Sequence, residues 1–445
     1  MPLDDAAVTL DELLDRIASR EAMIGVVGLG YVGLPFAMEK TKVGFRVIGF
    51  DRMTERVEAV NAGESYIQDV PSADVAAART ADLLEATDDF SRLGDVDVIV
   101  VAVPTPLTVN LTPDLRFVEA VTHQVASTLR PGQLVCLEST TYPGTTDEIM
   151  RPILERTGLK ADDDFFLAHS PERVDPGNTR YSTKNTNKVV GGVGPRSLEA
   201  ATRFYRETID HVVPVSSASA AELVKVFENT FRAVNIALVN ELTMLCDRMD
   251  LSVWEVLDAA FTKPFGIMPF YPGPGVGGHC IPLDPHYLEW KAREYNFTTR
   301  FIALAGEINR RMPEFVRDKA LRILGRLGVA SKGARLLALG VSYKRDLDDY
   351  RESPALEVIT LLEAEGMSVE YHDAFVPRFE HDGRERSSVE LSDAAVAAAD
   401  LVVILTDHTE VDYERVVRNA RHVLDTRNAT GRLDLGPLAE RVTLL

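Results

Sequence analysis

The sequence predicts an α/β protein in which two Rossmann-like, doubly wound parallel-sheet domains are joined by a long central helix and a helical region. Three observations carry this prediction: short apolar strands alternate with helical segments in the first half, the alternation returns after Lys332, and a long helical pattern separates the two parts. Continuous apolar strands that alternate with helices are typical of parallel sheets covered on both faces. A chain of 445 residues also exceeds what one hydrophobic core usually supports.

The first expected βαβ unit contains a glycine-rich turn. Strands are expected over residues 23–27 and 45–50, and between them lie Gly28-Leu29-Gly30-Tyr31-Val32-Gly33 and a helix. Gly28 and Gly30 allow a pyrophosphate to approach the backbone, and Gly33 allows the helix to pack on the strand. The helix N-terminus offers unpaired N–H groups to the phosphate. The alternative is a glycine turn in a Rossmann-like sheet that binds no nucleotide.

Asp51 ends the second expected strand, where a carboxylate can accept hydrogen bonds from the adenosine ribose of a dinucleotide. Its charge would repel a 2′-phosphate, so the sequence favours NAD over NADP. Arg52 and Arg56 leave NADP open, because either guanidinium could pair with that phosphate. Further strands are expected over 96–103 and 134–138.

The middle of the chain has a helical apolar pattern. From about Ser219 to Ala260, apolar residues recur at spacings of three and four, which predicts one long, largely buried helix. Such a helix would join two domains and offers a natural surface for dimerisation. Beyond it we expect strands over 335–341, 368–372 and 401–405 and a helix over 353–365.

Composition and charge exclude several classes of function. The formal net charge of −20 argues against a general affinity for nucleic acid or an anionic membrane. The chain has three cysteines and no CxxC pair, so neither a disulfide framework nor a cysteine-rich zinc site is expected. The first twenty residues lack the features of a signal peptide, and no apolar run approaches the roughly 20 residues that span a bilayer. We therefore expect a soluble, cytoplasmic protein.

The segment from Phe270 to Pro285 is rich in glycine and proline, which indicates a loop whose exposed N–H groups bind a polar ligand. Pro282 or Pro285 can begin the helix that follows, which would place Cys280 at its positive end and favour a nucleophilic thiolate. The alternative is that Cys280 is a small packed residue. His279 and His286 have no further ligands near them in the sequence, so no metal site is expected.

Two other segments could act with Cys280. Lys225 and Asn229 are four residues apart on the central helix, so both can donate hydrogen bonds to one oxyanion, although Lys225 could equally be a solvated lysine. The segment Glu138–Thr145 follows an expected parallel strand, at the sheet edge where doubly wound proteins bind ligands. Its hydroxyl groups could orient water or cofactor, or could cap the next helix.

These residues resemble the UDP-glucose/GDP-mannose dehydrogenase family over nearly the whole chain from Met23 onward. Seven ordered blocks carry the resemblance: Gly28–Gly33 (GLGYVG), Val103–Pro106 (VPTP), Glu138–Thr145 (ESTTYPGT), Ser170–Arg173 (SPER), Glu222–Thr230 (ELVKVFENT), Gly273–Asp284 (GPGVGGHCIPLD) and Gly340–Pro354 (GVSYKRDLDDYRESP). The resemblance implies an N-terminal extension (1–20), an NAD-binding Rossmann domain (21–214), a central helical dimerisation region with the catalytic loop (215–312) and a UDP-sugar-binding Rossmann-like domain (313–445). A homodimer or dimer-based oligomer is implied as well.

The resemblance also implies the chemistry: NAD-dependent four-electron oxidation of a nucleotide-sugar CH2OH group to a carboxylate, through a thiohemiacetal and a thioester on Cys280. Lys225 and Asn229 would stabilise the oxyanion, Asp284 with Thr140 would hold a water, and Glu172 would position or activate water for hydrolysis. The implied cofactor-binding residues are Gly28, Gly30, Tyr31, Val32, Gly33, Asp51, Arg56, Thr105, Thr140 and Arg351. The implied substrate-binding residues are Glu172, Arg173, Val174, Lys225, Asn229, Tyr271, Gly273, Gly277, Gly278 and Lys344.

The segments 262–275 and 284–294 look most like the branch that acts on UDP-N-acetylglucosamine. The sequence departs from the UDP-glucose branch at two places. That branch has a second acid after the Ser-Pro-Glu motif, where this chain has Pro176 nearby, and it commonly has a lysine at the position of Leu283. Because small changes in a sugar pocket alter preference, UDP-glucose, a thymidine diphosphate sugar and UDP-N-acetylmannosamine stay open as substrates. A two-electron hydroxyacid dehydrogenase and an inactive nucleotide-binding protein are the alternatives from other classes.

Overall fold

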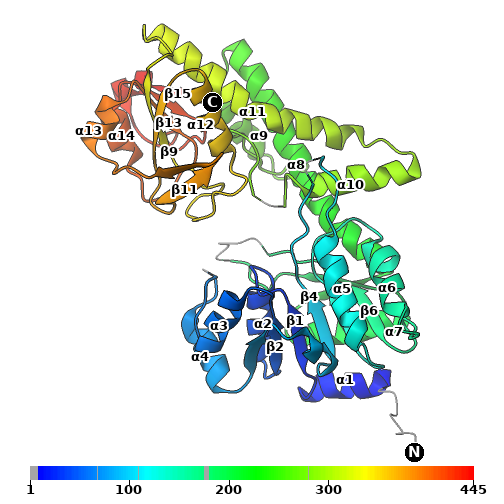
Figure 1. The fold of residues 1–445 in the computed structure, drawn as a ribbon. Coiled ribbons are helices and arrows are strands. Elements are labelled where there is room, and N and C mark those ends of the chain that lie inside the picture. Colours follow the sequence, from blue (N-terminus) through cyan, green and yellow to red (C-terminus); the bar gives the residue numbers. More distant parts are fainter. Residues whose placement is uncertain (1–8, 68, 109, 175–179, 279) are drawn as a thin grey trace, which may run out of the picture. The chain divides into compact units, whose positions relative to one another are not determined.

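The computed structural model describes residues 9–445 except 68, 109, 175–179 and 279. The chain forms two compact units (Figure 1). The first comprises Met1–Glu228 and His286–Phe297, and the second comprises Asn229–Pro285 and Thr298–Leu445. The sequence boundaries that were predicted for the domains stay a prediction.

The first unit is built on an eight-stranded sheet of order β3-β2-β1-β4-β5-β6-β7-β8. Its strands are β1 Ile24–Val27, β2 Val47–Phe50, β3 Leu84–Thr87, β4 Val98–Val101, β5 Leu134–Leu137, β6 Phe166–His169, β7 Lys188–Gly192 and β8 Val212–Val215. Its helices include α2 Gly33–Lys42, α3 Thr54–Ala62, α4 Ser72–Thr80, α5 Arg116–Thr128, α6 Arg151–Glu155 and α7 Pro195–Arg206, with short helical turns η1 Phe90–Gly94 and η2 Thr146–Met150. The chain order reverses beside β1, which lies between β2 and β4, and ligands bind at such a point in doubly wound folds.

The expectation of a wholly parallel first sheet needs one correction. β6 and β7 pair antiparallel, with Ala168 opposite Gly192 and His169 opposite Gly191, and the other strand pairs of this sheet are parallel. The apolar strands β1, β2, β4 and β5 are buried along their length, as helices on both faces require.

A short helix, α1 (Leu10–Ser19), precedes the first strand. It begins with a capping box between Thr9 and Glu12 and buries Leu13 and Ile17 in the core of the first unit. Arg16 Nη2 lies 2.8 Å from the Oδ2 of buried Asp97. The part of the N-terminal segment that is described is therefore a packed element of the first unit.

The predicted long central helix is confirmed as α8 (Ala218–Met249), but its expected extent to about Ala260 and its expected burial were wrong. Helix α8 ends where Asp250 takes a left-handed φ of 56°, and α9 (Val253–Phe261) begins with Ser252 as its N-cap. Several apolar side chains of α8 are exposed: Leu223, Phe227, Phe231, Leu238, Leu245 and Met249. Periodicity identifies the residues that share a face, but it does not show that the same chain covers them.

The second unit contains a parallel sheet of order β10-β9-β13-β14-β15 and an antiparallel hairpin of β11 and β12. The strands are β9 Arg335–Leu339, β10 Ser368–His372, β11 Arg378–His381, β12 Arg384–Ser387, β13 Leu401–Ile404, β14 Val423–Asp425 and β15 Val442–Leu444. Its helices include α11 Arg300–Arg326, α12 Pro354–Ala364, α13 Asp393–Ala398 and α14 Tyr413–Asn419, with the turn η4 Gly436–Arg441, whereas most of α10 (Asp284–Ala292) and the turn η3 (Arg293–Tyr295) belong to the first unit. Figure 1 labels most of these elements, and together they confirm a second Rossmann-like domain.

Candidate functional site

The glycine turn after β1 has the geometry of a phosphate-binding turn. Gly28 has a φ of 92°, and a Cβ there would lie 2.3 Å from the carbonyl oxygen of Ala102. A Cβ at Gly33 would lie 1.8 Å from the carbonyl oxygen of Gly28. At Gly30, by contrast, the nearest atom to such a Cβ is Nη1 of Arg56, at 4.0 Å. The turn thus leaves open space above its middle glycine, next to the start of α2, where a pyrophosphate fits.

Asp51 follows β2 and fixes this turn. Its Oδ2 accepts hydrogen bonds from the backbone N–H of Leu29 (2.9 Å) and from Nη1 of Arg56 (3.2 Å), and its Oδ1 accepts one from Met53 N–H (2.9 Å). Arg56 therefore pairs with the carboxylate that was expected to bind the ribose. The Tyr66 hydroxyl donates to the carbonyl oxygen of Leu29 at 2.7 Å, which holds the turn from the other side.

Two further predicted cofactor residues lie together in the first unit. The Thr105 hydroxyl donates a hydrogen bond to the carbonyl oxygen of Thr140 at 2.7 Å, so the loops after β4 and β5 are tied to each other. Tyr31 is exposed at the glycine turn, and Val32 occupies the N-cap of α2.

A buried chain of charges connects Glu138, which follows β5, with Glu172. The Nζ of Lys188 lies 3.1 Å from Oε2 of Glu138 and 3.1 Å from Oε2 of Glu172. The Tyr205 hydroxyl donates to Oε1 of Glu138 at 2.7 Å. Burial raises the pKa of Glu138, whereas burial and two carboxylates act in opposite directions on Lys188 and leave its pKa raised. Lys188 is thus the shared counter-ion of two carboxylates.

Both carboxylate oxygens of Glu172 are engaged. Oε1 accepts hydrogen bonds from the backbone N–H groups of Arg173 (2.7 Å) and Val174 (2.8 Å), and Oε2 faces Lys188. Burial raises the pKa of Glu172, but the Lys188 ammonium and these N–H groups outweigh it, so the pKa is lowered. The structure therefore places Glu172 as an ionised anchor of the segment that carries Arg173 and Val174.

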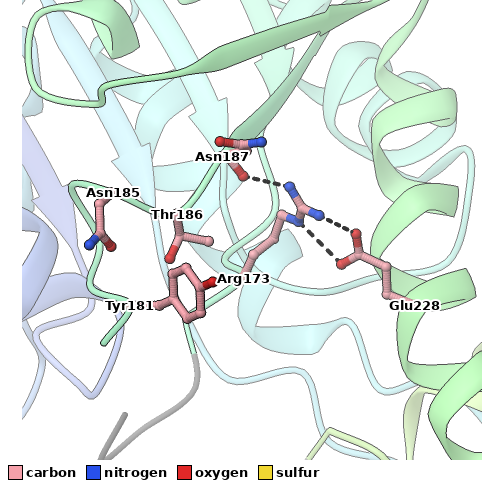
Figure 2. A pocket seen from close by; sticks show the side chains of 6 residues that line it. All are labelled: Arg173, Tyr181, Asn185, Thr186, Asn187 and Glu228. Carbon is pink, nitrogen blue, oxygen red and sulfur yellow. Dashed lines mark hydrogen bonds and ion pairs between the residues drawn. The ribbon is translucent and has the colours of Figure 1, made fainter. Parts of the chain in front are cut away.

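Arg173 and Glu228 form an ion pair beside a polar hollow of about 270 Å³ (Figure 2). The guanidinium contacts both oxygens of Glu228, at 3.2 Å and 2.5 Å, and donates to the carbonyl oxygen of Asn187 at 2.5 Å. The hollow is lined by Arg173, Tyr181, Asn185, Thr186, Asn187 and Glu228. Each of these six side chains carries a hydrogen-bonding group, so the hollow suits a polar ligand.

Helix α8 carries Glu222, Lys225 and Asn229 on its buried side. Glu222 accepts hydrogen bonds from Gly144 N–H (2.5 Å) and from the N–H and hydroxyl of Thr146 (2.9 and 2.7 Å). It therefore fixes the loop after β5 that also contains Thr140. Lys225 and Asn229 follow at helical spacing, as the sequence predicted.

Cys280 is exposed, unlike Cys136 and Cys246, which are buried. Its carbonyl oxygen accepts hydrogen bonds from Leu283 N–H (3.2 Å) and Asp284 N–H (2.9 Å), and α10 begins at Asp284. The cysteine thus lies in the turn that leads into α10, with Ile281, Pro282 and Leu283 between it and the first residue of the helix. His279 lies outside the described residues, and His286 Nδ1 lies 3.5 Å from Oε2 of Glu289.

Asn229 and Asp284 are brought together in the second unit. The side-chain amide of Asn229 donates to Oδ2 of Asp284 at 2.5 Å, and both residues are buried. Since the amide keeps its carbonyl oxygen and second N–H, Asn229 can orient Asp284 and still contact a ligand.

Gly277 and Gly278, two glycines of the predicted catalytic loop, pack against Tyr343 in the second unit. A Cβ at Gly277 would lie 2.8 Å from the side chains of both Pro354 and Tyr343, and one at Gly278 would lie 3.1 Å from the Tyr343 ring. Tyr271 donates its hydroxyl to Asp258 at 2.9 Å and stacks on Trp254. Arg351 donates to both carboxylate oxygens of Asp349, at 2.9 and 2.7 Å.

Arg427 was not singled out from the sequence. Its Nη1 lies 2.7 Å from the position that a Cβ on Gly273 would take, and its Nε donates to the carbonyl oxygen of Leu405 at 2.9 Å. Burial, with Arg345 nearby, lowers the pKa of Arg427 to about 10. A half-buried guanidinium beside a glycine loop is a candidate to bind an anion. The short sequence Asp425-Thr426-Arg427-Asn428 contains no local signal of this proximity.

Comparison with known proteins decides the family. Three domain models of the UDP-glucose/GDP-mannose dehydrogenase family match successive parts of the chain: the NAD binding domain over 22–209, the central domain over 219–311 and the UDP binding domain over 337–432. The chain belongs to the UDP-glucose/GDP-mannose dehydrogenase family. It is therefore an NAD-dependent nucleotide-sugar dehydrogenase, and the predicted family, enzyme class and NAD cofactor are confirmed.

Relatives of this dehydrogenase match over most of its length. The UDP-N-acetyl-D-mannosamine dehydrogenase of Pyrococcus horikoshii is 36% identical over 412 residues, which cover 91% of this chain and 95% of the relative. The UDP-N-acetyl-D-glucosamine 6-dehydrogenase of Pseudomonas aeruginosa is 34% identical over 412 residues, with 91% and 96% covered. A solved structure of the P. horikoshii UDP-D-ManNAc dehydrogenase superposes with a TM-score of 0.85 at 33% identity and covers 93% of this chain and 97% of its own.

The described part of the dehydrogenase contains neither a candidate membrane span nor a candidate metal cluster. In residues 9–445, apart from 68, 109, 175–179 and 279, every helix is too short or too polar to span a bilayer. Within the same residues, no group of three or more His, Cys, Asp or Glu side chains is arranged to hold a metal ion.

Proposed function

We propose that this protein oxidises the C6 hydroxymethyl group of a nucleotide sugar to a carboxylate, with Cys280 as the nucleophile. One observation carries the proposal: Cys280 is exposed, and its carbonyl oxygen accepts a hydrogen bond from the N–H of Asp284, the first residue of α10, which is itself held by Asn229. A simple alcohol dehydrogenation needs no thiol. An exposed cysteine supplies the nucleophile that a second oxidation of the same carbon requires.

The proposed reaction has four steps. The C6 alcohol first loses a hydride and a proton and becomes an aldehyde. The Cys280 sulfur then forms a bond to C6, and the aldehyde oxygen takes up a proton to give a thiohemiacetal. Loss of a second hydride and proton gives a thioester, after which water attacks C6, the S–C6 bond breaks, and the acid leaves. NAD accepts one hydride in each oxidation, so two NAD are consumed for each sugar.

The proposed roles of the other side chains follow from their surroundings. Lys225 and Asn229 stabilise negative charge on the C6 oxygen, because one offers an ammonium and the other an amide N–H from the same side of α8. From the family resemblance alone, we propose that Asp284 and Thr140 hold the water that takes part in proton transfer. Glu172 positions the segment of Arg173 and Val174, since its two engaged oxygens suit an anchor better than a proton acceptor.

We propose UDP-N-acetylglucosamine as the substrate. Relatives named for N-acetylated UDP-sugars, at 34% and 36% identity, support an N-acetyl sugar. The polar hollow beside Arg173 suits an acetamido substituent, since it offers side-chain amides and a guanidinium. UDP-N-acetylmannosamine, UDP-glucose and a thymidine diphosphate sugar are the competing substrates.

The nucleotide would be bound by the glycine loop and by cations of the second unit. Tyr271, Gly273, Gly277, Gly278 and Lys344 were predicted from the sequence, and we add Arg427 because its guanidinium lies against Gly273. Arg351 is proposed to face the cofactor. The formal net charge of −20 alone would disfavour a diphosphate ligand, and these cations offset that repulsion locally.

We also propose that the protein forms a homodimer through α8. The exposed side chains Leu223, Phe227, Phe231, Leu238, Leu245 and Met249 fall at spacings of four and seven, so they form one apolar stripe along the helix. An apolar stripe of this length is typical of a protein–protein interface.

The test is the product and the stoichiometry. Purified protein is given NAD and, separately, UDP-N-acetylglucosamine and each competing sugar, and the product is identified by mass. We expect two NADH per sugar and a uronic acid. The Cys280→Ser variant should form no thioester and no acid while its Kd for NAD stays unchanged, and Cys246→Ala, at a buried cysteine, serves as the control. One NADH per sugar with a released aldehyde would mean a two-electron dehydrogenase instead.

A further inference from the structure

A buried carboxylate–imidazole pair, Asp373 and His408, lies in the second unit outside the residues assigned so far. We propose that these two side chains are positioning residues: they fix the loop after β9, and through Tyr343 of that loop they hold the glycine segment that leads to Cys280. The part of this inference that concerns nucleotide binding rests on the proposed function. The part that concerns the loops does not.

Asp373 follows β10, and both of its carboxylate oxygens accept hydrogen bonds from backbone N–H groups. Its Oδ2 accepts hydrogen bonds from Val341 N–H (2.7 Å) and Ser342 N–H (3.1 Å). Its Oδ1 accepts from Phe375 N–H (2.9 Å) and Val376 N–H (3.0 Å). In the first unit the corresponding acid, Asp51 after β2, also holds the turn after β1. The second Rossmann-like half therefore uses its acid to hold the backbone.

His408 completes the pair and selects one tautomer. The backbone N–H of Asp346 donates to its Nδ1 at 3.0 Å, so Nδ1 is an acceptor and the proton is on Nε2. Nε2 then donates to Oδ2 of Asp373 at 3.0 Å. The imidazole also stacks on Phe375, with ring centroids 4.9 Å apart. His408 thus bridges Asp373 to a second point of the loop.

Asp346, whose N–H is bound by His408, is also held through its side chain. The carboxylate of Asp346 accepts from the N–H and the hydroxyl of Thr409, at 2.9 and 3.0 Å, and Asp346 itself has a left-handed φ of 58°. Hydrogen bonds therefore fix Val341 and Ser342 at one end and Asp346 at the other. Tyr343, Lys344 and Arg345 are the residues between them.

Tyr343, which lies between Ser342 and Asp346, contacts the glycine segment before Cys280. A Cβ on Gly277 or Gly278 would meet the Tyr343 side chain at 2.8 and 3.1 Å, so these two glycines pack directly against Tyr343. They precede Cys280 by three and two positions. Lys344, the proposed cation for the nucleotide, follows Tyr343 directly. Displacing this loop would therefore disturb the nucleotide site and the cysteine segment together.

The experiment compares His408→Ala with His408→Asn and with His422→Ala. His422 contacts Thr443 in the same domain, at 2.8 Å, and provides a control for simple loss of a histidine. Hydrogen–deuterium exchange is measured for the peptides that cover 341–352, 273–285 and 24–50, and calorimetry gives the Kd values for UDP and for NAD.

In His408→Ala we expect exchange in 341–352 and 273–285 to accelerate and the Kd for UDP to rise, each by roughly tenfold, because buried polar groups lose their partner. Exchange in 24–50 and the Kd for NAD should stay unchanged, as should every readout in His422→Ala. His408→Asn, which keeps an acceptor near Nδ1 but loses the link to Asp373, should lie between. If His408→Ala does not fold, the exchange rates and the Kd for UDP of His408→Asn test the proposal instead.

Wild-type exchange in both loops of a folded variant would overturn the proposal. If the wild type binds no UDP, the nucleotide assignment fails, whereas the exchange result still decides whether His408 positions the loops. Faster exchange throughout the second unit would show a structural role alone and would also overturn it.

Discussion

At the residue scale, the three glycines of the first turn are needed for different reasons. Gly28 and Gly33 are required by the protein's own packing, because a side chain at either position would overlap a carbonyl oxygen. Gly30 has open space above it. Its small size is therefore explained by the ligand and not by the fold.

This difference predicts opposite effects of alanine substitution. Gly33→Ala should lower Tm by several degrees, because its Cβ would lie 1.8 Å from the Gly28 oxygen. Gly30→Ala should leave Tm unchanged and raise KM for NAD at least about tenfold, because its methyl group occupies the space of the pyrophosphate. Thermal melts and NAD titrations check both. A Gly30→Ala variant with normal NAD binding would show that the cofactor does not approach this glycine.

Lys40 is a second case in which one residue has a measurable effect. It is fully buried, it donates to the Phe204 carbonyl oxygen and the Thr208 hydroxyl at 2.9 Å each, and burial lowers its pKa to about 7. In the unfolded chain the pKa of Lys40 returns to the ordinary lysine value of 10.5. Between these values the unfolded state binds more protons, so the stability of the wild type rises with pH.

We therefore expect Lys40→Met to be favoured at pH 7 and to lose its advantage towards pH 9. The free energy of unfolding of the wild type should gain up to about 2 kcal/mol relative to the variant over this range. Chemical denaturation at several pH values measures the difference. Parallel stability curves for the two proteins would show that Lys40 does not titrate in this window.

At the scale of elements, Lys188 joins three parts of the first unit. It belongs to β7, and its ammonium lies between Glu138, which follows β5, and Glu172, which follows β6. Removing it would leave two carboxylates without their shared counter-ion, and the penalty of an unpaired buried charge exceeds the net value of the pair.

Lys188→Met should therefore destabilise the protein by about 3 kcal/mol or more, and it should lower kcat because the anchor of Arg173 and Val174 is lost. Lys184→Met, at an exposed lysine in the preceding loop, is the control and should change neither quantity. Denaturation and steady-state kinetics check this. Unchanged kcat in a destabilised Lys188→Met would restrict the lysine to a structural role.

Local patterns predicted β1, β2, β4 and β5 of the eight-stranded sheet and β9, β10 and β13 of the five-stranded sheet, and the strand expected over 368–372 matches β10. The antiparallel pairing of β7 with β6 was not predictable, because the sequence of a five-residue strand contains no signal for its direction. The same limit applies to the site. The turn around Gly28 is local and was predicted, whereas the approach of Arg427 to Gly273 and the engagement of Glu172 by Lys188 depend on contacts distant in sequence.

At the scale of the whole molecule, the acidic composition and the anionic ligands require the cations to be placed locally. The chain has 68 acidic and 48 basic residues. Many of its arginines are paired with carboxylates, as Arg173 is with Glu228 and Arg351 is with Asp349. Arg427 instead donates to a backbone carbonyl and lies beside a glycine, so its charge is available to a diphosphate.

The apolar stripe of α8 gives the last prediction, which concerns assembly. Leu238→Glu with Leu245→Glu places two charges on exposed positions of the stripe, so it should weaken self-association at least about tenfold without lowering helix content. Arg232→Glu changes an exposed residue on another side of the same helix and should leave association unchanged. Sedimentation velocity over a range of concentrations measures the dissociation constant. A double variant with the mass of the wild-type oligomer would exclude the stripe as the interface, and a monomeric wild type would exclude the dimer itself.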